Sequence, residues 1–169
     1  MAMDVKADVK KLTEKTINEG GVLATLYFDI HAATKEDAQK LGAGFLQHLI
    51  QMPGVVYAVG EIEEPILSEE GKNFSSYIEV KVLTRTFFAL ANICLTHSPF
   101  TIEIHRPEEI RMPLNQANEL LGQLSATTAD YKKMFITRLA SPEELAEFQR
   151  QLALRAEMGK KILEKKDKK

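Results

Sequence analysis

Histidine and carboxylate side chains are the groups in this 169-residue chain best suited to acid–base chemistry and ligand binding. Asp29 and His31 stand two residues apart near the end of one alternating segment, and Glu103 and His105 repeat that spacing in another. Two carboxylates whose pKa values differ can act as a general acid and a general base, and histidine titrates near neutral pH. With the neighbouring Tyr27, these residues form the candidate ligand-binding set.

Four segments carry the alternation of apolar and polar side chains that predicts β-strands. They are residues 22–32, 55–64, 75–83 and 100–105. The apolar positions, which in the last segment are Phe100, Ile102 and Ile104, are expected to face a core. The remaining positions then share the opposite side of a sheet, called here the second face. It is expected to hold Thr25, Tyr27, Asp29, His31, Tyr57, Glu61, Tyr77, Glu79, Lys81, Thr101, Glu103 and His105.

Helical spacing of apolar residues predicts two helices between these strands, over residues 35–52 and 85–97. Thr34 and Thr84 are the predicted N-caps. Gly42 and Gly44 lower the helix propensity of the first, and close packing of that helix on the sheet accounts for them. The order of elements is βαββαβ, and short right-handed connections leave few topologies for it. We therefore expect an α+β fold, a ferredoxin-like sandwich whose antiparallel sheet has the order 4-1-3-2 and two helices on one face.

Additional helices flank this core on both sides. Residues 1–21 are expected to form an N-terminal helix that ends at Gly20 and Gly21, residues 22–106 the core, and residues 107–169 a helical extension. The extension contains two amphipathic helices. The second is predicted to start at Ser141, with Glu144 as its capping-box partner, and residues 125–128 are a possible kink or break in the first. The apolar stripes require burial, either on each other, on the second face, or on a second subunit.

The stretch from Met52 to Leu95 resembles small regulatory domains of the ACT and RAM type. Pro53, Gly54 and Val55 form a turn that opens a strand, Gly60 follows within it, and a strand over residues 78–83 leads straight into a helix. The resemblance covers about half of the chain. It implies dimers or larger rings formed through sheets and helices, in some cases with a small metabolite at the interface.

Antiparallel pairing of the first and last strands decides which candidate residues can meet. His31 and His105 end the two strands, so they are expected to lie far apart and to hold no metal ion within one chain. No spacing typical of a metal site is present, although a site across a subunit boundary stays open. Asp29 and Glu103 are expected to form a carboxylate pair on neighbouring strands.

Two further features have both a functional and a structural interpretation. Glutamates gather at the end of the second strand and in the hairpin that follows, at Glu61, Glu63, Glu64, Glu69 and Glu70. These glutamates can bind a divalent cation, but the favoured interpretation is a charged hairpin exposed to solvent. The single cysteine, Cys94, lies in an apolar run and is read as a buried thiol rather than as a nucleophile.

Charge and hydropathy indicate which partners to expect. The formal net charge of −2 argues against a general nucleic-acid binder. Tyr27 and Tyr77 occupy positions that could stack RNA bases, but acidic side chains surround them. No apolar run approaches the roughly 20 residues that cross a bilayer, so no membrane partner is expected. One cysteine and no secretory leader point to the cytoplasm.

These features lead to a non-catalytic, self-associating module, a homodimer or higher oligomer that needs no cofactor and can respond to a small molecule. The alternative is an enzyme whose site, built from Asp29, His31, Glu103 or His105, lies on the second face or at a subunit interface. The sequence identifies neither the ligand nor the pathway.

Overall fold

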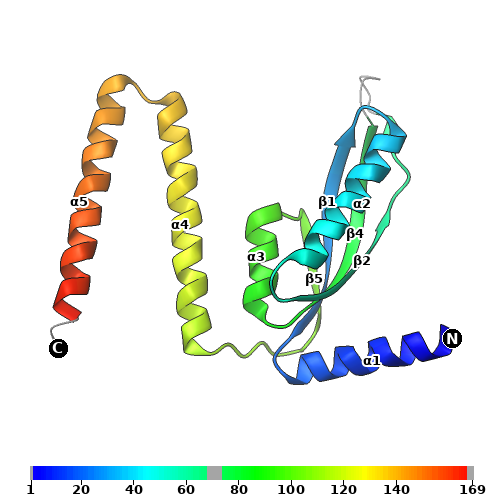
Figure 1. The fold of residues 1–169 in the computed structure, drawn as a ribbon. Helices are drawn as coiled ribbons and strands as arrows, with labels where there is room; N and C mark the ends of the chain where they lie inside the picture. The colour runs from blue at the N-terminus through cyan, green and yellow to red at the C-terminus, as the bar shows by residue number, and fades with distance from the viewer. Residues whose placement is uncertain (1, 68–73, 167–169) are drawn as a thin grey trace. The chain divides into compact units, whose positions relative to one another are not determined.

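A computed structural model of the chain describes residues 2–67 and 74–166 (Figure 1). Within these ranges the chain is α+β, with five helices and an antiparallel sheet of five strands. The elements in chain order are α1 (Ala2–Asn18), β1 (Val22–Ala32), α2 (Lys35–Gln51), β2 (Val55–Ile62), β3 (Ile66–Leu67), β4 (Phe74–Thr84), α3 (Phe87–His97), β5 (Thr101–Arg106), α4 (Leu114–Leu139) and α5 (Pro142–Lys166).

The sheet order is β2-β4-β1-β5, and β3 pairs with β4 outside this path. The expected sheet had four strands in the order 4-1-3-2. The numbers differ because β3, a two-residue strand that the sequence pattern does not predict and of which Leu67 falls in the predicted hairpin loop, counts as a strand of its own. Each of the four long strands has the neighbours that were expected for it. Residues 68–73 of the predicted hairpin loop, which spans residues 67–74 and contains Glu69 and Glu70, lie outside the described residues.

The main core lies between one face of the sheet and the helices α2 and α3, which cover that face in Figure 1. Leu26, Val80 and Ile78 of the sheet are fully buried there together with Leu49 of α2 and Ile93 of α3. Buried and more exposed side chains alternate along residues 26–31 of β1 and 77–82 of β4, because successive side chains of a strand point to opposite faces.

Threonine side chains cap both core helices. Thr34 caps α2 as predicted, since its hydroxyl accepts a hydrogen bond from the backbone N–H of Asp37 at 3.1 Å. The prediction of Thr84 as the cap of α3 is wrong. Thr86 caps that helix through the N–H of Ala89, whereas Thr84 ends β4 and is fully buried. Two threonines that stand two residues apart offer the same capping chemistry, so the sequence alone could not separate them.

Helix α1 packs on one end of the second face. Ile17, Leu23 and Leu83 form a small buried cluster there, and the Thr13 hydroxyl lies 3.2 Å from the Tyr57 hydroxyl. The helix ends where Gly20 adopts a φ of +98°, a left-handed conformation that favours glycine. The second face is therefore covered at this end by the chain itself.

Strand β5 lies at the edge of the sheet and is exposed along its whole length. Ile102 and Ile104 lie opposite Leu26 and Ala24, on the helix-covered face as expected, yet they remain 46% and 43% exposed. Phe100 was expected to point into the core. Its ring instead contacts Tyr27 and Tyr77 of the second face, because the residue precedes the strand and does not follow its alternation.

The chain divides into two compact units, Met1–Leu120 and Leu121–Lys169. The second unit contains most of α4, a turn at Ala140 and Ser141, and α5. Helix α4 runs through residues 125–128 without a break, and the Thr128 hydroxyl donates to the carbonyl of Leu124. The capping box of α5 is confirmed: Glu144 accepts from the N–H of Ser141, and the Ser141 hydroxyl accepts from the N–H of Glu144.

Candidate functional site

Three polar side chains form a hydrogen-bonded row at the far end of the second face. His31 lies between Asp29 and Ser75: its Nε2 is 2.9 Å from Asp29 Oδ2, and its Nδ1 is 3.0 Å from Ser75 Oγ. The register of the sheet creates this row, because His31 of β1 lies directly opposite Ser75 of β4. The connectivity is that of a serine nucleophile, a base and an orienting carboxylate.

The surroundings of this row differ from those of a working nucleophile. The side chains of His31 and Asp29 are 62% and 63% exposed, so water screens their interaction. A nucleophile of this kind needs donors placed for a developing oxyanion and a site that excludes water. The row can orient a proton at Ser75, but the exposure of His31 and Asp29 to water makes the row a poor catalytic site.

Next to this row, three aromatic rings cluster on the second face. Tyr27 lies 6.4 Å from Tyr77 and 6.2 Å from Phe100, measured between ring centroids, and Tyr77 lies 6.4 Å from Phe100. Such tilted and perpendicular contacts are favourable for aromatic pairs. The cluster joins β1, β4 and the residue that leads into β5.

Acidic side chains surround this cluster. Partial burial raises the pKa of the Tyr27 phenol, and the negative charges of Glu103 and Glu79 add to the rise. The negative potential over the rings favours cationic groups and opposes a phosphate backbone. We still predict that the protein has no nucleic-acid partner, and the negative potential agrees with that prediction.

The last candidate pair, Glu103 and His105, lies toward the opposite end of β1. Glu103 is paired with Thr25, and His105 Nε2 lies 2.7 Å from the Thr25 hydroxyl, which is buried. Thr25 precedes Asp29 by four residues, about 13 Å along a strand. The predicted carboxylate pair of Asp29 and Glu103 is therefore wrong: Asp29 pairs with Tyr77 in the sheet and bonds to His31.

The structure thus divides the candidate set into three places. Asp29 and His31 lie together, Tyr27 lies in the aromatic cluster, and His105 binds Thr25 near Glu103. His31 and His105 lie far apart, because six residues of β1, about 20 Å, separate His31 from the partner of His105. Across residues 2–67 and 74–166 no group of three His, Cys, Asp or Glu side chains could hold a metal ion.

Sequence reasoning missed Ser75, Phe100 and His97. Ser75 could have been found from the strand register, once the pairing of β1 with β4 was fixed. His97 ends a helix, where the helix dipole favours a positive charge, but burial lowers its pKa and the nearby His48 adds to this effect. Cys94 is half-buried, and burial raises the pKa of its thiol, as an inert thiol requires.

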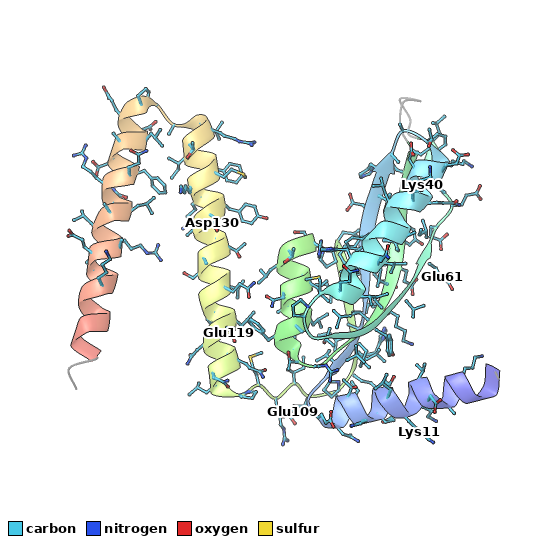
Figure 2. All side chains as sticks on the ribbon, in the orientation of Figure 1. Lys11, Lys40, Glu61, Glu109, Glu119 and Asp130 are labelled. Carbon is cyan, nitrogen blue, oxygen red and sulfur yellow. The ribbon has the colours of Figure 1, made fainter. Side chains whose placement is uncertain are left out.

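Figure 2 shows all described side chains on the ribbon, with Glu61 labelled on β2 and Glu119 and Asp130 on α4. Glu61 lies opposite Glu79 in the sheet, which adds to the acidic character of the second face. In the described part of the chain, no helix combines the length and the apolar character needed to span a membrane.

The model of one protein family, the MJ0538 family, matches residues 23–153. The match begins within β1 and ends within α5, so it joins the sheet and most of the helical extension in a single sequence pattern. No curated protein matches the chain. No ACT or RAM family was identified, and that resemblance stays a prediction.

Proposed function

We propose that the chain, which belongs to the MJ0538 family, is a non-catalytic, ferredoxin-like module that self-associates. The hairpin of α4 and α5 joins two copies. The observation that carries this proposal is the apolar surface that the hairpin leaves uncovered.

Helix α4 has 26 residues and no buried residue among them. Leu124 and Tyr131 stand seven residues apart, and Leu121 and Phe135 stand fourteen apart with the polar Thr128 midway between them. This spacing is typical of helices that pack side by side in a bundle. Leu121 is 65% exposed and Phe135 58%, so α5 does not bury the stripe.

The hairpin also contains an unfilled space. Near the turn a cavity of about 530 Å³ opens between α4 and α5, and its walls include Phe135, Leu139 and Phe148. This space is open to solvent and its walls are mainly apolar, so it is a surface that other apolar side chains can bury. Two helices alone therefore leave this core incomplete, and additional helices would fill it.

We infer that the additional helices are the hairpin of a second copy. Two antiparallel hairpins with one apolar stripe on each helix make a four-helix bundle. Charge supports the pairing, since α5 starts with Glu143, Glu144 and Glu147 and carries Arg155 and Lys160 later along its length. Antiparallel packing of two α5 helices places the acidic end of each against the basic part of the other.

The test is the mass of the particle in solution. Wild-type protein, Phe135→Glu and Val59→Glu are compared by size-exclusion chromatography with light scattering. Val59 is 63% exposed on β2, outside the hairpin, so Val59→Glu controls for an added charge at an exposed apolar position. We expect a dimer or larger particle for wild-type and Val59→Glu, and a monomer for Phe135→Glu. A monomeric wild-type chain, or an unchanged particle mass for Phe135→Glu, would contradict the proposal.

A second candidate is hydrolytic catalysis at the row of Ser75, His31 and Asp29, favoured by its two hydrogen bonds of 3.0 and 2.9 Å. A fluorophosphonate probe labels a serine only where a base activates it. Ser76→Ala is the matched control for Ser75→Ala, because the Ser76 hydroxyl bonds to the carbonyl of Glu63 and not to His31. Labelling that Ser75→Ala abolishes and Ser76→Ala preserves would establish this candidate; no labelling is expected.

A further inference from the structure

The last part of β1 has a free edge. Strand β5 pairs with β1 only as far as Tyr27, which lies opposite Thr101, whereas β4 pairs with β1 to its end at Ala32. Residues 28–32 therefore have β4 on one side and, among the described strands, no partner on the other, and Figure 1 shows β1 extending past the end of β5. A free edge presents backbone N–H and C=O groups with which another extended chain can pair.

The backbone groups at this free edge belong to Asp29 and His31. The N–H of Phe100 donates to the carbonyl of Tyr27 at 2.9 Å, so that carbonyl points to the β5 side of β1. Backbone groups point to the same edge of a strand at every second residue, so those of Asp29 and His31 point to this side as well, beyond the end of β5. In the part of the chain that the structure describes, no loop backbone bonds to them. Two residues of an added antiparallel strand can therefore form four hydrogen bonds here.

A half-open cavity of about 310 Å³ lies at the same edge, on the helix-covered side of the sheet. Its apolar walls include Phe28, Ile30, Leu41 and Phe45. Asp29 and His31 also border the cavity, and because their side chains bond to each other on the second face, they border it from the edge of the strand. The free backbone groups and the cavity are therefore parts of one surface. Strand addition takes its affinity from backbone hydrogen bonds and its specificity from pockets for alternate side chains.

We propose that the free edge of β1 binds an extended segment of another protein by strand addition, with an apolar side chain in the cavity and a lysine or arginine beside Asp29. In antiparallel pairing, the residues of the segment opposite His31 and Asp29 make the backbone bonds and place their side chains on the second face. The residue between them lies opposite Ile30, on the helix-covered side, where the cavity receives its side chain. A basic residue opposite Asp29 forms a cross-strand pair of opposite charge. The proposal does not rest on self-association, because one chain forms the whole site.

The probe is the peptide acetyl-Val-Thr-Leu-Lys-amide, whose Thr, Leu and Lys would lie opposite His31, Ile30 and Asp29. Binding to the full chain is followed by NMR chemical-shift changes of the Asp29 and His31 backbone amides and of the Leu41 methyl groups. We expect saturable changes at all three residues. A peptide with Ala in place of Leu should bind about tenfold more weakly, because it leaves the cavity unfilled. A peptide with Glu in place of Lys should bind about fivefold more weakly, because it sets a carboxylate opposite Asp29.

Two N-methylated forms of the peptide test the backbone pairing. Methylation of the Lys backbone nitrogen removes a donor that faces β1, so it should weaken binding about tenfold. Methylation of the Leu backbone nitrogen is the matched control, because that N–H points away from β1 and its loss should leave binding unchanged. A peptide held only by its side chains would respond equally to both methylations.

Two variants of the protein locate the site, and a third is their control. Leu41 is 54% exposed at the wall of the cavity, so Leu41→Trp should fill the space and abolish the preference for Leu over Ala in the peptide. Val59→Trp adds the same bulk at an exposed position on β2 and should keep that preference. Asp29→Lys should reverse the preference for Lys over Glu, because it reverses the charge opposite that residue of the peptide.

The inference is overturned if the peptide produces no saturable shifts at these residues, if the two methylated peptides bind alike, or if Leu41→Trp keeps the preference for Leu. Protection of the Asp29 and His31 amides from hydrogen exchange in the free protein would also overturn it, because a strand of a second copy or of the chain itself would then already cover the edge. Repeating the titration with Phe135→Glu separates this inference from the proposed self-association. Saturable binding to that variant, whatever its oligomeric state, supports a site within one chain, and loss of binding contradicts it.

Discussion

Arg106 at the end of β5 binds Glu14 of α1 through both carboxylate oxygens, at 2.6 and 3.0 Å. The hydrogen bond from this guanidinium is the main reason why the pKa of Glu14 lies below its ordinary value of 4.5. The pair joins elements that are 92 residues apart in the chain and holds α1 beside the cluster of Ile17, Leu23 and Leu83. The N-terminal helix is thereby part of the sheet domain.

We predict that Arg106→Gln loosens α1 without unfolding the sheet. Both side chains are 44% exposed, and exposed ion pairs contribute little to global stability. Hydrogen exchange should therefore quicken in α1 and stay unchanged in α3. Arg111→Gln removes another exposed ion pair, with Glu109, and is the control. Equal exchange in α1 for wild-type and Arg106→Gln would show that the pair does not hold the helix.

The same pair predicts an acid dependence of α1 docking. Because the folded state lowers the pKa of Glu14, its ion pair stabilises docking at pH values above 4.5 and this contribution is lost as the pH falls below 4.5. In Arg106→Gln the loss has already occurred, so exchange in α1 should respond less to acid.

Gly42 and Gly44 provide a third prediction, with one glycine as the control for the other. A Cβ added at Gly42 would lie 2.8 Å from Ile62 Cγ1 and 3.2 Å from Ile30 Cδ1, whereas one at Gly44 meets nothing within 4 Å. Gly42→Ala should therefore destabilise the fold by about 1–3 kcal/mol through overpacking. Gly44→Ala should stabilise it by about 0.5–1 kcal/mol through helix propensity.

Chemical denaturation monitored by circular dichroism measures both changes. Opposite signs for two identical substitutions in one helix are the expected result. If both variants are stabilised, α2 does not pack on β2 as closely as the structure shows.

The long elements could be predicted because their periodicity is strong. Val80 and Ile78 alternate with charged side chains, and Thr34 and Ser141 mark helix starts that the structure confirms. The strand β3 could not be predicted, since a pairing of two residues leaves no periodic pattern. The use of Thr86 instead of Thr84 as a cap depends on where β4 ends, which packing decides.

The site was less predictable, because chemistry there depends on register rather than on spacing along the chain. Asp29 and His31 share a strand face, so their contact follows from the sequence. Ser75 joins them only because β4 lies opposite β1 in one particular register. Asp29 and Glu103 were expected to pair, but β5 stops short of Asp29.

The negative electrostatic potential of the second face yields another prediction. Burial raises the pKa of Tyr27, and Glu103 is the largest charge contributor to the rise. Glu103→Gln should therefore lower the pKa of Tyr27 toward its ordinary value of 10.0, as measured by NMR titration of the ring. Glu61→Gln, on the same face but on β2, should leave it unchanged. An unchanged pKa of Tyr27 in Glu103→Gln would mean that the two groups lie farther apart than this register places them.

His97 supplies the last prediction, on the dependence of stability on pH. Burial, and then the nearby His48, holds the pKa of His97 below its ordinary value of 6.5 in the folded state. The unfolded chain therefore binds a proton on this ring before the folded chain does, and stability is full above pH 6.5 and declines as the pH falls below it.

His97→Leu should flatten the decline in the free energy of unfolding between pH 6.5 and pH 4.5, above the range where Glu14 titrates. Denaturant titrations of wild-type and variant across this window make the comparison. Parallel curves for wild-type and His97→Leu would show that the His97 ring is solvated in the folded state.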